Sequence, residues 1–144
     1  MNGKNLFFII LIIFVKINLG ISQENLSESK HLYTEIDPRI IEVYNSQLEE
    51  LKKTPLILQT ITEIVQKRTE IIYEPFRDYE KIEKLSNFPL FNEYNPNLER
   101  DTDINPYTFN VLKYDLPFFP KLPTKYRIDG SDFVLVIFPL NFKN

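Results

Sequence analysis

An acidic segment in the second half of the chain has residue types that bind cations. Asp101, Asp103 and Asn105 match the first, third and fifth positions of an EF-hand calcium loop. The sixth position, normally glycine, is Pro106, and the twelfth, normally glutamate, is Leu112. We therefore expect no EF-hand. A looser calcium site with oxygen ligands stays open beside the interpretation that we favour, a solvated acidic turn.

Other residue types that catalytic sites need are scarce. The chain has one histidine, His31, and no cysteine. This excludes disulfides, cysteine nucleophiles, thiolate metal sites and zinc sites with two histidines. A Ser-His-Asp arrangement would have to use His31, and no serine stands in a nucleophile elbow. Only Gly130 follows residue 22, so phosphate-binding loops are excluded there. We expect no catalytic residue, no cofactor and no metal ligand.

The first 22 residues are typical of a cleaved secretory signal peptide. Lys4 precedes ten consecutive apolar residues, 6–15, a run too short to span a membrane. We expect cleavage before Gln23, a secreted, extracellular protein, and no membrane segment after cleavage. Residues 23–36 then form a loose polar leader. The sequence Asn25-Leu26-Ser27 makes Asn25 a candidate N-glycosylation site.

The remainder, residues 37–144, has a length suited to a single globular domain. Without the two lysines of residues 1–22, the net charge of the chain is −5. An acidic chain argues against nucleic acid as a partner, because phosphate binding needs clustered lysine and arginine. It argues equally against docking to anionic lipid.

The first part of this domain, from Asp37 to about residue 85, has sequence patterns typical of helices. Asp37 and Pro38 predict a helix start, and apolar residues recur at steps of three and four up to Leu51. Thr54 and Pro55 repeat the start signal for a second helix, whose apolar face extends to Ile72. A shorter third helix is expected over 75–85. These helices are amphipathic, which is typical of packing on a core.

Proline and aromatic residues alternate from residue 88 to 124, which predicts an extended, irregular segment. Within it, Tyr107, Phe109 and Val111 alternate with polar residues, so a strand pairing with a later hairpin is expected here. Exposed aromatic side chains can fill a partner's pocket. Phe118 and Phe119 are therefore candidate interaction residues, although such aromatics more often cover a core.

A hairpin is the clearest local signal in the sequence. Asp129-Gly130 lies between two β-rich runs, which predicts a two-residue type I′ turn. In that register Tyr126 would face Phe133, and Arg127 would form an ion pair with Asp132. Asp129 and Asp132 are accordingly expected in a turn and an ion pair rather than on a metal.

The second arm of the hairpin is apolar on both sides, so we expect a central strand covered twice. If the chain itself does not cover its second face, a partner or a second copy would. Three residues on that face join the candidate interaction surface: Val134, Val136 and Phe138.

These patterns predict an α+β fold with two or three N-terminal amphipathic helices on a small antiparallel sheet built around the C-terminal hairpin. We expect a small secreted, non-enzymatic protein that binds a protein or glycan partner. A homo-oligomer is also compatible with the sequence. Two alternatives stay open. One is a carrier of an apolar ligand between helices and sheet, and the other is a small carboxylate-based sugar-active enzyme.

Overall fold

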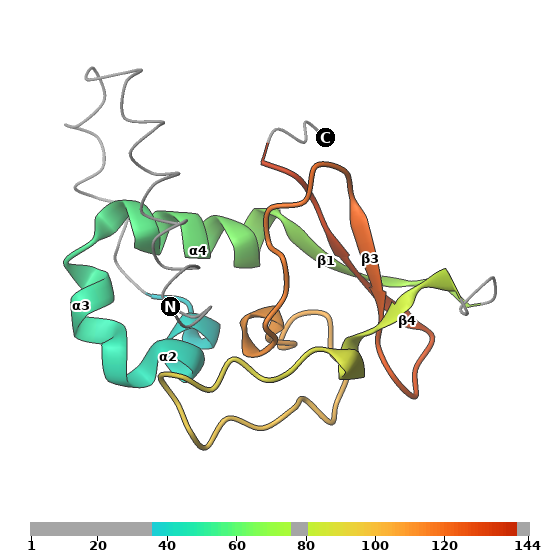
Figure 1. The fold of residues 1–144 in the computed structure, drawn as a ribbon, viewed down its shortest axis with the longest axis horizontal. Helices are drawn as coiled ribbons and strands as arrows, with labels where there is room; N and C mark the ends of the chain where they lie inside the picture. The colour runs from blue at the N-terminus through green and yellow to red at the C-terminus, as the bar shows by residue number, and fades with distance from the viewer. Residues whose placement is uncertain (1–35, 76–80, 141–144) are drawn as a thin grey trace, which may run out of the picture.

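A computed structural model describes residues 36–75 and 81–140 of the chain, which form an α+β fold (Figure 1). The class expected from the sequence is confirmed. His31, Asn25 and the expected signal peptide lie outside the described residues. The helical elements are α2 (Pro38–Tyr44), η2 (Asn45–Gln47), α3 (Leu48–Lys52), α4 (Pro55–Lys67), η4 (Leu85–Asn87) and η5 (Val111–Lys113). The strands are β1 (Thr69–Tyr73), β2 (Glu83–Lys84), β3 (Thr124–Arg127) and β4 (Phe133–Ile137).

The two expected helix starts are capped in different ways. The Asp37 carboxylate accepts a hydrogen bond from the Arg39 backbone N–H at 3.0 Å, so Asp37 caps α2 as its type predicts. Thr54 occupies the position before α4 but makes no capping bond. Its hydroxyl instead donates to the carbonyl of Leu51 at 3.0 Å, which ties α4 to the end of α3.

Helix α4 is shorter than the apolar pattern predicts. It ends at Lys67, and the residues that follow form strand β1. The expectation of helix through Ile72 was wrong because Thr69, Ile71 and Ile72 are β-branched and pair with β4. The expected third helix is also absent from residues 81–85, where β2 lies, while residues 76–80 are outside the description.

The four strands lie in the order β1-β4-β3-β2. β4 pairs antiparallel with both β1 and β3, so it is the central strand that its sequence predicts. The sheet is mixed rather than purely antiparallel, because β2 pairs parallel with β3. Long-range pairing of this kind leaves no local signal, since the partners are separated by about forty residues.

The hairpin loop has four residues rather than the expected two. The Ile128 N–H donates to the Phe133 carbonyl at 3.1 Å, which leaves residues 129–132 as the loop. Gly130 takes the positive φ of +71° there. The Asp129 carboxylate accepts from the backbone N–H and the hydroxyl of Ser86, at 2.9 and 3.0 Å. This tertiary contact holds the longer loop against the segment after β2.

The longer loop moves the pairing register by two residues. Tyr126 lies opposite Leu135, and Arg127 lies opposite Val134, so the expected Tyr126–Phe133 and Arg127–Asp132 pairs were wrong. A shift of two positions keeps every side chain on its expected face, because side chains alternate with a period of two. The prediction of which β4 side chains share a face is therefore correct, although the predicted register was wrong.

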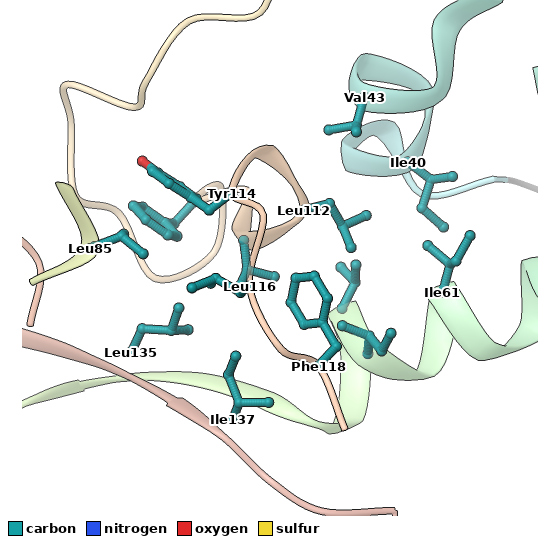
Figure 2. Close-up of a cluster of buried hydrophobic side chains, with 14 of the residues drawn as sticks. Ile40, Val43, Ile61, Leu85, Leu112, Tyr114, Leu116, Phe118, Leu135 and Ile137 are labelled. Carbon is teal, nitrogen blue, oxygen red and sulfur yellow. The ribbon is translucent and has the colours of Figure 1, made fainter. Parts of the chain in front are cut away.

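One face of the sheet packs on the helices and on the irregular segment 88–124. Figure 2 shows Leu135 and Ile137 of β4 pointing toward Phe118 and Leu116, and Ile61 of α4 at the other end of the same cluster, next to Ile40. The expected strand at 107–111 is absent. The Asn105 carbonyl accepts from the N–H groups of Thr108 and Phe109, which closes a turn instead.

Candidate functional site

The opposite face of β4 is buried as well. Val134 is 0% and Val136 4% exposed, and these two side chains lie outside the main core. Their strand neighbours on this face are Glu70, Ile72, Lys125 and Arg127. The Lys125 ammonium lies 2.7 Å from the Glu74 carboxylate. By register this ion pair passes diagonally over β4, so Val134 and Val136 offer no accessible surface in the described chain.

The three candidate aromatic residues come together at one buried cation. The Arg68 guanidinium donates to the backbone carbonyls of Phe118 and Phe138, and it lies 5.1 Å from the ring centroid of Phe119. Phe118 is buried, whereas Phe119 and Phe138 are partly exposed. Burial lowers the pKa of Arg68. The cluster joins the α4–β1 junction to two later segments, which is a structural role.

A buried lysine, Lys113, forms ion pairs with one acidic residue of the calcium-loop-like segment and with Glu42. Lys113 is 6% exposed, and its ammonium lies 2.5 Å from Asp101 and 2.7 Å from Glu42. Burial opposes this charge, but the hydrogen bonds to Asp101 and Glu42 outweigh it and raise the pKa of Lys113. Asn110, fully buried, donates to Glu42 and to the Arg39 carbonyl. Within the described residues no three acidic or histidine side chains gather as metal ligands.

One apolar hollow among the described residues is small. It measures about 30 Å³ and lies among Tyr44, Ile64, Phe91, Leu116 and Phe118. A volume of this size holds about one or two water molecules. An apolar ligand of drug size needs roughly 300–1,000 Å³. This hollow is therefore too small to hold such a ligand.

A larger groove runs beside strand β1 and has a volume of about 480 Å³. Its floor and walls come from the end of α4, from β1 and from the turn that contains Tyr107. The lining residues are Arg39, Val65, Gln66, Thr69, Glu70, Ile71, Pro106, Tyr107, Phe109, Val111 and Leu135. Glu70 is the one acidic residue among them, so the groove lacks the pair of carboxylates that glycoside hydrolysis uses.

Strand β1 is one edge of the described sheet (Figure 1). The Glu74 N–H donates to the Asp132 carbonyl, and the Arg68 carbonyl accepts from the Phe138 N–H. Even-numbered residues therefore make the ladder to β4, because hydrogen-bonded positions alternate along an antiparallel strand. Thr69, Ile71 and Tyr73 direct their backbone groups away from β4, and no backbone bond joins them to another described segment.

In the described sheet, the outer edge of β1 is less protected than the other edge, with Glu70 as the one charged residue of the strand. The other edge, β2, has two charged residues, Glu83 and Lys84. β1 has five residues, of sequence TEIIY, with no proline, glycine or lysine. Short, charged or proline-bearing edges resist pairing with other chains, whereas a longer apolar edge is a template for it. Strand β1 and the adjoining groove are together called the edge site below.

The sequence pattern missed this site because it assigned Ile72 to a helix. The β-branched run Thr69–Ile72 was the available signal, and it competed with the continuing apolar stripe of α4. No family model, no curated protein and no solved structure matches this chain. Within residues 36–75 and 81–140, no helix is both long and apolar enough to cross a bilayer.

Proposed function

We propose that this chain is a small secreted, non-enzymatic protein that binds an extended polypeptide segment at the edge site. The observation that supports this most is the outer edge of β1, which pairs with no other strand of the described sheet and lies beside a groove of about 480 Å³. An extended peptide can add a strand to such an edge. Main-chain hydrogen bonds then supply affinity, and the groove receives alternate side chains.

The residue inventory supports binding rather than catalysis. The carboxylates of Asp101 and Glu42 are both engaged in ion pairs with Lys113. Asp37 is likewise engaged by Arg39 at 2.8 Å. The edge site itself offers backbone donors and acceptors, apolar side chains and a single carboxylate. Such a surface is suited to holding a chain in place.

The test is a selection of linear peptides from a random library against the immobilised protein. We expect the selected peptides to bind wild type and to lose binding to Ile71→Pro, which removes one outward N–H. Proline is tolerated on an edge strand where the N–H faces solvent, so the β1–β4 ladder should remain. Ile71→Thr is the matched control, because it shortens the side chain but keeps the N–H.

Loss of binding in Ile71→Pro with retention in Ile71→Thr supports the proposal, provided that circular dichroism shows both variants folded. Peptides that bind both variants equally, or an absence of any selected peptide, would overturn it.

Secretion is tested separately with the full sequence expressed in eukaryotic cells. We expect protein in the medium whose intact mass starts at Gln23, with added glycan mass that Asn25→Gln removes. Retention of the uncleaved chain inside the cells would contradict the secreted assignment without affecting the edge site.

A further inference from the structure

We infer that the partner of the edge site is a second copy of this chain, paired antiparallel through β1 about a two-fold axis at Ile71. This rests on the proposed function, because it takes the edge site as the binding surface and names its occupant. The two copies would form one continuous eight-stranded sheet.

The backbone of β1 is self-complementary in this arrangement. The outward groups belong to Thr69, Ile71 and Tyr73, which are spaced evenly about Ile71. A two-fold axis at Ile71 places Ile71 opposite its own copy and Thr69 opposite Tyr73 of the second copy. All three outward-facing residues then meet outward-facing residues, as an antiparallel ladder requires.

Charge selects this register over its neighbours. Moving the second strand by two residues in one direction places Glu70 opposite Glu70 of the other copy. Moving it in the other direction places Glu70 opposite Glu74. Like charges directly opposite each other destabilise a strand pair. With the axis at Ile71, Glu70 faces Ile72 instead, and no carboxylates in β1 oppose each other.

The side chain of Tyr73 projects from β1 at a position that matches the groove of the second copy. Tyr73 is 64% exposed and packs edge-on against Phe133 of the core-side face, with ring centroids 5.5 Å apart. In the two-fold register, Tyr73 of the second copy lies beside Thr69 on this same face. Thr69 lines the groove together with Gln66 and Tyr107. The groove of each copy can therefore receive the tyrosine of the other.

The occupied groove would bury two of the most exposed large side chains of the described chain. Tyr107 at its rim is 89% exposed. Gln66 and Thr69 bring polar groups to the groove that can pair with a tyrosine hydroxyl. Aromatic side chains that enter a pocket near the centre of an interface commonly dominate binding.

Disulfide trapping tests the register directly, because the natural chain has no cysteine. In the expected dimer the two Ile71 Cα atoms form a hydrogen-bonded pair about 5.5 Å apart, within the range that a disulfide spans. Ile71→Cys should therefore yield a covalent dimer under mild oxidation. Thr69→Cys is the control, since its two copies lie four residues apart along the strands, about 13 Å.

Sedimentation velocity on the secreted protein across a concentration series measures the dimer itself. We expect a reversible dimer in wild type, with affinity weakened about tenfold or more by Tyr73→Ala. Tyr73→Ala leaves the β1 backbone and the groove intact, so it should still bind the selected linear peptides. Peptide binding by Tyr73→Ala therefore distinguishes a loss of dimerisation from a loss of the edge site itself.

A dimer that Ile71→Cys traps and Thr69→Cys does not trap supports the inference. A monomer at all concentrations that still binds edge peptides overturns the second copy and leaves the proposed function standing. A dimer unaffected by Tyr73→Ala and not trapped at Ile71 uses another surface, and also overturns the inference. A monomer that binds no peptide overturns both proposals.

Discussion

Lys113 is a buried cation held by two carboxylates from distant parts of the chain, Glu42 of α2 and Asp101. Asp101 also accepts a hydrogen bond from the Asn110 N–H at 3.0 Å. Asp101, the first residue of the sequence that resembled half of a calcium loop, thus belongs to an internal ion pair. The charge of Lys113 therefore has a structural role, because it compensates the largely buried carboxylate of Asp101 and also pairs with the more exposed Glu42.

Lys113→Met should lower the free energy of unfolding by about 1–3 kcal/mol, since it leaves the largely buried Asp101 without its cation, while water can solvate the exposed Glu42. Urea denaturation of wild type and variant measures the difference. Lys53→Met is the matched control, because Lys53 pairs with Glu50 on an exposed helix surface and should change stability by less than about 1 kcal/mol. Equal effects of both substitutions would show that the buried network contributes no more than a surface pair.

Asp37 gives the stability a defined dependence on pH. The Arg39 guanidinium, through its hydrogen bonds, lowers the pKa of Asp37 below its usual value. The stabilisation that the Asp37 carboxylate gives the folded state is therefore fully present above the unfolded-state pKa of about 3.9. It is lost as the pH falls through the lower, folded-state pKa. Asp37→Asn keeps a capping oxygen but removes the charge.

We expect wild type to exceed Asp37→Asn in stability by about 0.5–1 kcal/mol at pH 5–7. The difference should shrink progressively below pH 4. Urea denaturation of both proteins at pH 7, 5, 4 and 3 tests this. A difference that stays constant across the series would mean that the carboxylate charge does not contribute.

At the scale of elements, the junction between α4 and β1 depends on Arg68. This residue ends the helix and receives a backbone hydrogen bond from Phe138 on its carbonyl. Its side chain bonds the carbonyls of Phe118 and Phe138, while its Nη1 atom is buried without a hydrogen-bond partner. A planar guanidinium reaches both carbonyls at once, which a lysine ammonium on a flexible stem cannot reproduce.

Arg68→Lys should therefore destabilise the protein by about 1–3 kcal/mol although the charge is kept, because a buried carbonyl loses its donor. Thermal or urea unfolding measures the loss. Lys67→Arg, at the exposed neighbouring position, exchanges the same residue types in reverse and should have little effect. Unchanged stability in Arg68→Lys would show that one of the two carbonyl bonds suffices.

The same junction explains what the sequence could predict about the elements and what it could not. Pro38 and Pro55 fixed two helix starts locally, and the two apolar faces of β4 indicated its central place. The end of α4 had no such local marker. The helix ends where it does because Ile71 pairs with Leu135 of β4. A contact between residues so far apart in the chain cannot be predicted from a short stretch of sequence.

For the molecule as a whole, the α+β class followed from the order of helical and strand patterns. The candidate site did not follow, because it depends on which strand lies at the edge and on the groove beside it. The sequence predicted that Val134 and Val136 are covered but not by what, and in the structure the ion pair of Lys125 and Glu74 lies over that face. In the described sheet, the edge strand beside the groove is β1, whose pairing partner lies much later in the chain.

The separation between β1 and β4 also bears on how the protein is made. Leu135 follows its partner Ile71 by about sixty residues, an interval of several seconds at roughly 5–20 residues translated per second. Until β4 leaves the ribosome, the TEIIY strand lacks the one strand that it pairs with in the described sheet. Nascent chains on neighbouring ribosomes then have time to meet through this strand, so yield should depend on translation speed and on the density of ribosomes along the message.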